Sequence, residues 1–337
     1  MQRNLEGLVT KTADLSPAHY VHLHNHTHHS LLDGLTKVDE LVKRVKELGM
    51  EAVAMTDHGT MSGAVEFYKA CKDEDIKPII GIETYVATRT IHDRDPVKDK
   101  ARYHLILLAM NDIGYQNLMR LSTIANLEGV YYKPRIDHNL LEQYNEGLIA
   151  LSACAGGELG ELLRVDNYEE AKRVAEWYKS IFGDRYYLEV QDHGHPEAPK
   201  SWDEQIKINQ SLLKLSADLN IPAVVTCDAH YLSESDTDAH EILLCVGTGA
   251  YLSDEKRMSL KDFHLHVTDP TELIARWGRE HPELLANSKA IADRCNVELE
   301  LGRILIPTFP VPEGETGKTY LHKLVWSGLA WRYGAID

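Results

Sequence analysis

Nine residues that commonly bind metal ions occur at intervals between positions 24 and 230 of the chain. The first two, His24 and His26, are two residues apart in a strand-like run, so their imidazoles point to the same face. The others fall in or just after later strand-like runs: Asp33, His58, Glu83, His104, Cys154, Asp228 and His230. This mixture of imidazole, carboxylate and one thiolate suits zinc, with manganese or iron as substitutes. The residue types therefore indicate a site for divalent metal ions.

Each of these residues is a weak signal by itself. A single histidine in a strand usually has a structural role, Asp57 or Asp228 could cap a helix, and Cys154 could be a small core side chain. Their joint placement at successive strand ends is improbable by chance. In a barrel of parallel strands the carboxyl ends meet at one mouth, where such folds keep their active sites. The set as a whole predicts one convergent metal site.

The elements that would position these residues alternate between strands and helices. Apolar, β-rich runs predict seven strands, at 20–26, 52–56, 78–87, 103–110, 147–152, 186–191 and 223–227. The spacing of Val38, Leu41, Val42 and Val45 is typical of a helix with one buried face. This alternation predicts an α/β fold with a mostly parallel sheet, closed into a distorted (β/α)7 barrel. An open doubly wound sheet shares the pattern.

The chain divides into three expected parts. These are an N-terminal extension at 1–19, a barrel domain at 20–268, and a C-terminal helical extension at 269–337. The charged segment 88–102 predicts an exposed loop within the barrel. After about His266 the alternation stops, and a helical stretch at 271–297 leads into a Pro-rich segment at 306–313 and a last helix that ends near Tyr333.

Composition limits the classes of protein to consider. The formal net charge of −16 excludes nucleic-acid binding through a diffuse basic surface, so local cations such as metal ions would have to attract a phosphate ester. The five cysteines are odd in number and lack C-x-x-C spacing, which argues against a disulfide framework or a zinc knuckle. Apolar runs are too short to span a bilayer and the start resembles no signal peptide, so we expect a cytoplasmic protein without membrane contact.

Short motifs around these residues resemble the polymerase and histidinol phosphatase (PHP) superfamily. The run Tyr20 to Thr27, followed by Ser30 to Gly34, is similar to its first motif. Further matches lie at 56–59, 81–83, 104–108, 132–135 and 228–232. More narrowly, the chain resembles the PHP domains at the N terminus of bacterial DNA polymerase III alpha subunits. Residues 294–297 and 307–314 are similar to the junction that leads into the polymerase palm.

The resemblance implies three divalent metal ions, with zinc expected. It assigns His24, His26, Glu83 and Asp228 to the first ion, and Glu83 as a bridge with His104 and Cys154 to the second. Asp33, His58 and His230 are implied for the third ion. Because all nine positions carry a ligand residue, the resemblance favours an active site.

Several nearby residues receive further roles. Glu83 and Asp228 belong to the expected catalytic set. Lys133 and Arg135 form a cationic edge that orients a phosphate or, equally, a solvated pair near a turn. His193 is interpreted as a general acid or as a residue that orients a ligand. His22 is expected to be structural or to support the ligands, His28 and His29 to face solvent, and Asp57 to orient His58.

The resemblance implies metal-dependent hydrolysis of phosphodiesters, because a metal ion lowers the pKa of its bound water from about 15.7 to near 7. The expected activity is that of a 3′→5′ proofreading exonuclease, with no polymerase activity in this chain. Its expected partners are DNA 3′ ends, the palm and thumb of the polymerase chain and other replisome subunits. Two alternatives stay open: a phosphatase like histidinol phosphatase, and a metal-stabilised platform without catalysis. An amidohydrolase also begins with H-x-H, but the remaining motifs fit it poorly.

Overall fold

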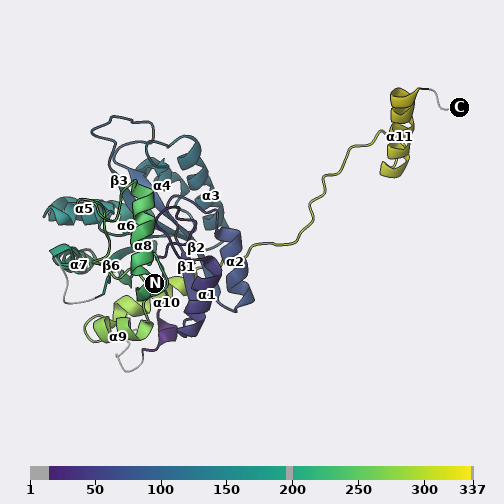
Figure 1. The fold of residues 1–337 in the computed structure, drawn as a ribbon. Coiled ribbons are helices and arrows are strands. Elements are labelled where there is room, and N and C mark those ends of the chain that lie inside the picture. Colours follow the sequence, from purple (N-terminus) through teal and green to yellow (C-terminus); the bar gives the residue numbers. More distant parts are fainter. Residues whose placement is uncertain (1–14, 195–199, 335–337) are drawn as a thin grey trace, which may run out of the picture. The chain divides into compact units, whose positions relative to one another are not determined.

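A computed structural model of the chain describes residues 15–194 and 200–334, so most of the expected N-terminal extension lies outside the described residues. The chain forms two compact units, Met1–Glu298 and Leu299–Asp337. The first unit contains the strands and all helices but the last. Figure 1 shows its strands in the middle, with α1 and α2 on one side and α5, α6 and α7 on the other. The helices are α1 (Val38–Glu47), α2 (Ala64–Asp73), α3 (Asp112–Leu127), α4 (His138–Tyr144), α5 (Glu158–Arg164), α6 (Tyr168–Phe182), α7 (Lys200–Leu219), α8 (Thr237–Thr248), α9 (Pro270–Trp277), α10 (Pro282–Arg294) and α11 (Gly317–Tyr333).

A seven-stranded sheet forms the centre of the first unit, which confirms the expected α/β fold. The strands are β1 (Ala52–Met55), β2 (Lys77–Ala87), β3 (Arg102–Ala109), β4 (Arg135–Ile136), β5 (Leu148–Leu151), β6 (Tyr186–Gln191) and β7 (Ala223–Thr226). They are arranged in the order β1-β2-β3-β5-β6-β7, and the short β4 pairs with β2. Strand β4 was not expected from the sequence, because its two residues are too few to produce an alternating pattern.

One strand, β3, departs from the parallel arrangement. It pairs antiparallel with both β2 and β5, whereas β1–β2, β2–β4, β5–β6 and β6–β7 are parallel. The cause is the connection between β2 and β3. Residues 88–101 contain no helix, so this connection makes a long hairpin instead of the helical crossover that a parallel pair requires.

The segment at 20–26 was expected to be a strand, but it contributes only isolated bridges. His22 pairs with Val53 of β1, and Asn25 pairs with Ala229 just after β7, both in parallel. Backbone bonds run from Ala54 N to His22 O at 2.9 Å and from His26 N to Ala229 O at 2.7 Å. Because β1 and β7 end the sheet order, this segment joins the two edges and closes the barrel.

The core of the first unit lies between the sheet and its helices. Val38, Leu41, Val42 and Val45 of α1 are all buried, as their spacing predicts. The expected helical stretch at 271–297 is two helices, α9 and α10. Helix α10 packs on β7, where Asn287 Nδ2 donates to Ala223 O at 2.7 Å, and its Ser288 Oγ accepts a bond from Val21 N at 2.9 Å. The division at 1–19, 20–268 and 269–337 stays a prediction.

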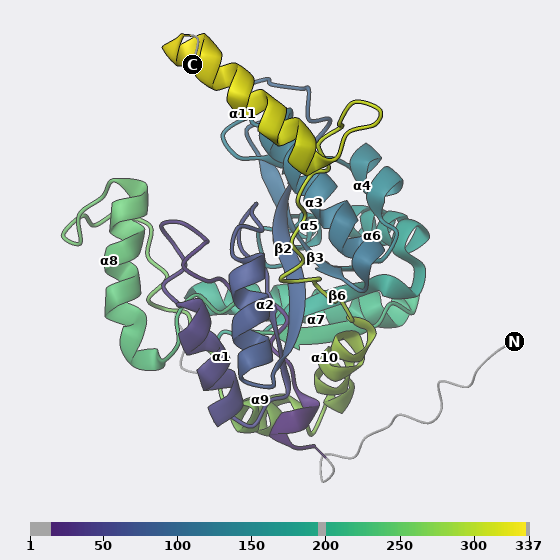
Figure 2. The same cartoon turned by 90° about the vertical axis from the view of Figure 1, so that its right-hand side faces the viewer.

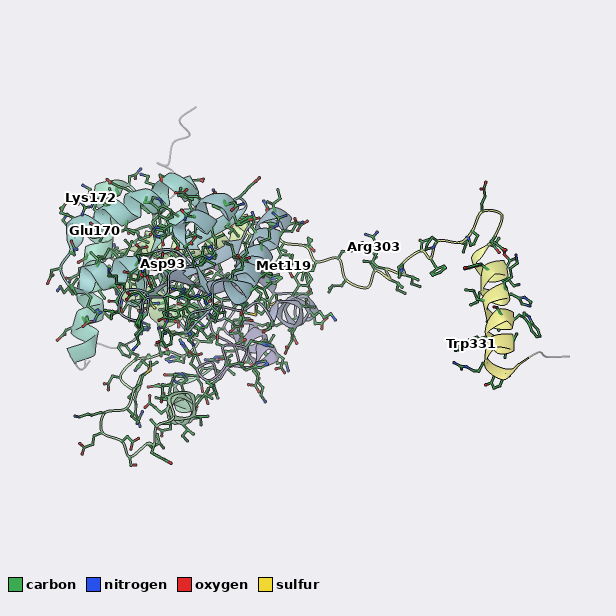
Figure 3. All side chains as sticks on the ribbon, turned by 90° about the horizontal axis from the view of Figure 1, so that it is seen from above. Asp93, Met119, Glu170, Lys172, Arg303 and Trp331 are labelled. Carbon is green, nitrogen blue, oxygen red and sulfur yellow. The ribbon has the colours of Figure 1, made fainter. Side chains whose placement is uncertain are left out.

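The second unit consists of an extended segment followed by α11, which ends at Tyr333 as expected. Thr316 caps this helix by accepting a bond from Thr319 N. Large apolar side chains on α11 are exposed, among them Leu321, Trp326 and Trp331. Figure 3 shows Trp331 standing out from the helix, and its side chain is 83% exposed. Among the described residues, no helix is long and apolar enough to cross a membrane.

Candidate metal centre

The fold brings all nine predicted ligand residues to one end of the barrel. His58 follows β1, Cys154 follows β5, and Asp228 and His230 follow β7, so these parallel strands deliver their residues at their carboxyl ends. His104 lies near the start of β3. Because β3 is antiparallel, that start lies beside the end of β2, where His104 pairs with Tyr85. The antiparallel direction of β3 thus explains why His104 lies near the start of its strand, whereas most other predicted ligands follow the end of theirs.

The innermost group consists of His24, His26, Asp228 and Glu83. The Nε2 atoms of the two histidines are 3.1 Å apart and lie 3.0 and 3.1 Å from Asp228 Oδ1. The carboxylate of Glu83 is 3.6 Å from His24 Nε2 and 3.4 Å from His26 Nε2. Three of these side chains are fully buried, and Asp228 is 13% exposed. Four potential ligand atoms therefore converge on one shielded point.

A second group shares Glu83 with the first. The Oε1 atom of Glu83 is 2.8 Å from His104 Nδ1, and the Oε2 atom of Glu83 is 2.5 Å from His58 Nδ1. Cys154 Sγ lies 3.4 Å from His104 Nδ1. Glu83 thus contacts both groups, and each of its oxygens lies near one histidine of the innermost group and one histidine outside it.

The third group lies nearest to solvent. Asp33 Oδ2 is 3.1 Å from His58 Nε2, and the rings of His26 and His230 stack at 4.3 Å. Ring nitrogens of His26, His58 and His230 come within 4.8 Å of one another. A cavity of about 540 Å³ opens over Asp33, His58, His104, Cys154, Asp228 and His230. The site is therefore buried on one side and open on the other.

Two properties of these groups fit divalent metal ions. Several buried atoms form no hydrogen bond of acceptable geometry with the described residues, although histidine nitrogens lie close to some of them: both Glu83 oxygens, Asp228 Oδ1, Asp33 Oδ1 and His58 Nδ1. Leaving them unmatched would be costly, since buried polar groups are normally paired. In a tetrahedral zinc site with bonds of about 2.0–2.1 Å, neighbouring ligand atoms are about 3.3 Å apart, close to the spacings of the innermost group.

The electrostatics of the cluster are strongly coupled. Burial alone would lower the pKa of His24, but the carboxylates of Asp228 and Glu189 outweigh it and hold the pKa well above the usual value. Burial alone would raise the pKa of Glu83, but His104 and His58 hold it well below its usual range. Burial, with His58 and His230 nearby, lowers the pKa of His26 to about 3. These opposite shifts within a few ångströms are typical of a functional site.

Outside the nine residues, Glu189 supports the ligands and was not predicted. Its Oε1 is 2.6 Å from His24 Nδ1 and accepts a bond from Thr226 Oγ1. A carboxylate on the far ring nitrogen is the usual partner of a metal-binding histidine, because it fixes the tautomer and the ring orientation. The available signal was a charged residue inside the otherwise uncharged strand Tyr186–Gln191.

A second supporting carboxylate, Asp57, reaches two predicted ligands through Ser30. It accepts bonds from Thr27 N, Thr27 Oγ1 and Ser30 Oγ at 2.6, 2.8 and 2.8 Å. The Ser30 hydroxyl in turn lies 2.9 Å from His26 Nδ1. Asp57 therefore orients His26 through the loop at 27–30. The same Ser30 hydroxyl accepts a bond from His58 N at 3.1 Å, and the expected orientation of His58 by Asp57 stays a prediction.

The backbone is strained at the same places. Four non-glycine residues with positive φ are at, or directly before, a predicted site residue: Leu32 (72°), Tyr132 (63°), Ala153 (62°) and Asp228 (49°). Such conformations cost about 1–3 kcal/mol each and concentrate at functional sites. Turning the chain sharply after β5 and β7 lets Cys154 and Asp228 face the barrel mouth.

The two cations expected at the phosphate have different surroundings. Lys133 is exposed and lines the cavity, with its ammonium 5.5 Å from the centre of the Tyr85 ring. Arg135 is fully buried, and its guanidinium donates to the carbonyls of Gly129, Ile91, Asp93 and Asp99. The expectation that Arg135 meets a phosphate is wrong, because its donors hold the loop after β2.

The remaining histidines lie outside the ligand groups. His193 is buried, with Nε2 2.8 Å from Gln191 Oε1, and burial lowers its pKa. It does not line the cavity, so its role as a general acid stays a prediction. His22 Nε2 lies 2.9 Å from Thr268 O, a structural position. His28 and His29 form a separate, more exposed cluster with Glu66, in which His29 Nε2 is 3.0 Å from Glu66 Oε2.

Comparison with known proteins decides the family. The sequence pattern that defines the PHP domain matches residues 22–193. The chain belongs to the PHP domain family. This PHP chain is 43% identical over 321 residues to the DNA polymerase III subunit alpha of Treponema pallidum, and 42% identical over 326 residues to that of Thermus aquaticus. These alignments cover 94% and 93% of the chain but 27% and 26% of the relatives, so the PHP chain spans about a quarter of their length.

Among solved structures, similarities are more distant. An amidohydrolase from Chromobacterium violaceum aligns with a TM-score of 0.42 and 13% identity, over 63% of the PHP chain and 87% of its own. A two-domain protein from Bacteroides vulgatus, described as containing a predicted PHP-like metal-dependent phosphoesterase, aligns with a TM-score of 0.39 and 14% identity, over 80% and 62%.

Proposed function

We propose that this PHP chain is a metal-dependent phosphodiesterase that removes nucleotides from DNA 3′ ends, as a 3′→5′ proofreading exonuclease. The observation that carries the proposal is the convergence of nine ligand residues beneath one open cavity. Hydrolysis requires a complete set of ligands at a site that the substrate can reach. A purely structural metal site does not need to be accessible.

The residues fit three divalent ions, with zinc as the expected element. His24, His26, Asp228 and Glu83 would hold the first, Glu83, His104 and Cys154 the second, and Asp33, His58 and His230 the third. When bound, such ions activate water and neutralise charge on a phosphoryl group. This chemistry fits an acidic chain, whose net charge of −16 would otherwise repel DNA.

The protein groups around the ions have distinct tasks. Burial of His24, His26 and Glu83 excludes bulk water from the inner side of the site, which strengthens electrostatic interactions there. Glu189 and Asp57 fix the orientations of His24 and His26. Lys133 supplies a positive charge at the cavity, where it would attract a non-bridging phosphate oxygen.

We further propose that the chain works as part of a bacterial replicative polymerase, in the cytoplasm. Its relatives are named DNA polymerase III subunit alpha, and the PHP chain corresponds to about a quarter of each. Within its own unit α11 leaves apolar side chains such as Trp331 uncovered, which favours packing against another surface, here proposed to be the polymerase palm and thumb. Other replisome subunits are candidate partners of the same surface.

The test is shortening of a 3′-extended, 5′-labelled primer by the purified chain with added zinc or manganese. We expect stepwise release of mononucleotides that stops when a chelator is added. The double variant His24→Ala, His26→Ala should be inactive. The matched control is His28→Ala, His29→Ala, which removes a neighbouring histidine pair outside the cavity and should retain activity. Equal activity of wild type and the first double variant would contradict the proposal.

A second candidate is a platform without catalysis, favoured by the exposed apolar face of α11. In that case metal ions would raise the melting temperature, while no primer would be shortened at any metal concentration. A phosphatase like histidinol phosphatase predicts a third result, in which phosphomonoesters are hydrolysed and DNA is not.

A further inference from the structure

The cavity over the candidate metal centre has two chemically different sides. One side carries the outward-facing ligand residues together with Tyr85, Arg102 and Lys133. The other side, called here the apolar wall, is formed by Leu31, Leu32, Leu244, Met258 and Leu260. A site for a bare phosphate needs the first side alone, so the second calls for an explanation.

The charged side has two cations grouped around one aromatic ring. The guanidinium of Arg102 is 5.9 Å and the ammonium of Lys133 5.5 Å from the centre of the Tyr85 ring. That ring also stacks on His58, at 6.0 Å between centroids. Among the described residues, no carboxylate lies within ion-pair distance of Arg102 or Lys133. Their charges are therefore open to an anion that enters the cavity.

The apolar wall exposes large side chains where a ligand would lie. Leu31 is 81% exposed, Leu32 50% and Met258 54%. Apolar groups collected at the mouth of a polar site are typical of ligand binding, because a ligand gains free energy by covering them.

The apolar wall is held in place by a buried carboxylate. Glu241 of α8 accepts bonds from Leu260 N and Ser259 Oγ, both at 2.8 Å, and pairs with Arg257. These bonds fix the segment 257–260, which carries Met258 and Leu260. On the same helix, His240 Nε2 lies 2.9 Å from the carbonyl oxygen of Asp33, a predicted ligand. Figure 2 shows α8 set apart from the sheet, and the His240 bond joins this helix to the loop that carries Asp33.

We infer that the apolar wall binds the base and sugar of a single nucleotide whose phosphate lies at the metal centre. The inference deepens the proposed function and rests on it. A nucleotide matches both sides at once: its phosphate complements the ligand groups, Arg102 and Lys133, and its base covers the apolar wall. The cavity volume, about 540 Å³, lies within the range of about 300–1,000 Å³ for sites that hold molecules of this size.

The apolar wall also implies how the bases are treated. Base identity is read through hydrogen bonds to base edges. Helix α8 contributes a single polar side chain, Thr248, to the cavity lining, so it offers few such bonds. Contact with a base face is possible for every base. We therefore expect affinities for the four deoxynucleotides to agree within about threefold.

Binding measurements test the inference without relying on catalysis. Thymidine 5′-monophosphate and inorganic phosphate are titrated separately into the zinc-loaded chain by calorimetry. The nucleotide should bind at least about tenfold more tightly, the effect expected from covering one large apolar side chain. Leu32→Asn, which suits the positive φ at this position, and Met258→Gln should each remove most of this preference while phosphate affinity stays the same. The control Leu252→Gln alters an exposed leucine beyond the cavity lining and should change neither affinity.

Glu241→Gln tests the positioning role, since Glu241 reaches the cavity through Met258 and Leu260. We expect loss of nucleotide preference with unchanged phosphate affinity, a split that general destabilisation would not produce. Equal affinity for nucleotide and phosphate in the wild type, or equal effects of Met258→Gln and Leu252→Gln, would overturn the inference. Failure of the primer assay alone would count against the exonuclease proposal. The comparison of nucleotide and phosphate affinities would still decide whether the apolar wall binds a nucleotide.

Discussion

Glu189 Oε1 lies 2.6 Å from Nδ1 of His24, while Nε2 of the same ring lies 3.0 Å from Asp228. The imidazole is thus held at both nitrogens by carboxylates from two neighbouring strands, β6 and the end of β7. If Glu189 fixes the Nδ1–H tautomer, it directs the lone pair of Nε2 toward the metal position.

The substitution Glu189→Gln should weaken metal binding with little change in the fold. The amide keeps the size of the side chain but loses the charge that aligns His24. We expect the affinity for the tightest-bound zinc ion to fall about 10- to 100-fold, the usual effect of removing such a partner. Competition with a chromogenic chelator measures this affinity.

A matched control for this prediction exists elsewhere in the same chain. Glu158 Oε2 lies 3.0 Å from His138 Nε2, in a pair outside the cavity lining. Glu158→Gln should leave zinc affinity unchanged. If both substitutions weaken binding equally, the effect of Glu189 is not specific to His24.

Substitution by methionine should affect stability at Arg135 and substrate binding at Lys133. Arg135→Met leaves the carbonyl of Gly129 and buried carbonyls of the loop after β2 without a donor, so the free energy of unfolding should fall by about 3 kcal/mol. Lys133→Met alters an exposed residue and should change the free energy of unfolding by no more than about 0.5 kcal/mol. The same substitution should raise KM for a phosphodiester. Denaturant titration and steady-state kinetics separate the two. A destabilised Lys133 variant, or a stable Arg135 variant, would contradict these roles.

The sequence predicted the strands well where periodicity and burial agree. Strands β1, β2, β3, β5, β6 and β7 begin and end within one residue of their expected bounds. The direction of β3 was not accessible, because a strand has the same apolar pattern in either direction. Direction depends on the connection, and the loop expected at 88–102 is long enough for a crossover as well as for a hairpin. The bridge-only pairing of 20–26 was hidden for a similar reason, since bridging two strand ends needs contacts distant in sequence.

The nine residues predicted as ligands come together, but sequence could not separate Lys133 from Arg135. They are two residues apart, and which one faces the cavity depends on the turn at Tyr132, whose φ is 63°. Supporting residues such as Glu189 and Glu241 were missed because their function depends on contacts from distant segments. The assignment of individual ligands to individual ions stays a prediction.

Cys154 should be the most readily alkylated of the five cysteines in the metal-free protein. Its side chain is partly exposed at the cavity, whereas Cys71, Cys227, Cys245 and Cys295 are buried. Burial raises the pKa of Cys154, and it raises the pKa of Cys71, Cys227 and Cys295 to about 12, so access through the cavity is what sets Cys154 apart. Iodoacetamide labelling followed by peptide mapping should find Cys154 modified first, and zinc should slow the reaction. Labelling in urea, where all five react, is the control; no protection by zinc would argue against Cys154 as a ligand.

Metal removal should destabilise the fold, because the ligand groups leave several buried polar atoms unpaired. An ion at 100 times its dissociation constant adds about 2.7 kcal/mol to the free energy of unfolding, so zinc should raise the melting temperature clearly above that in a chelator. The variant His24→Ala, His26→Ala should lose most of this difference. The variant His28→Ala, His29→Ala should keep it, because that cluster lies outside the cavity. Differential scanning calorimetry measures the three proteins with zinc and with chelator, and equal melting temperatures of the wild type in the two conditions would contradict a metal site at the mouth of the barrel.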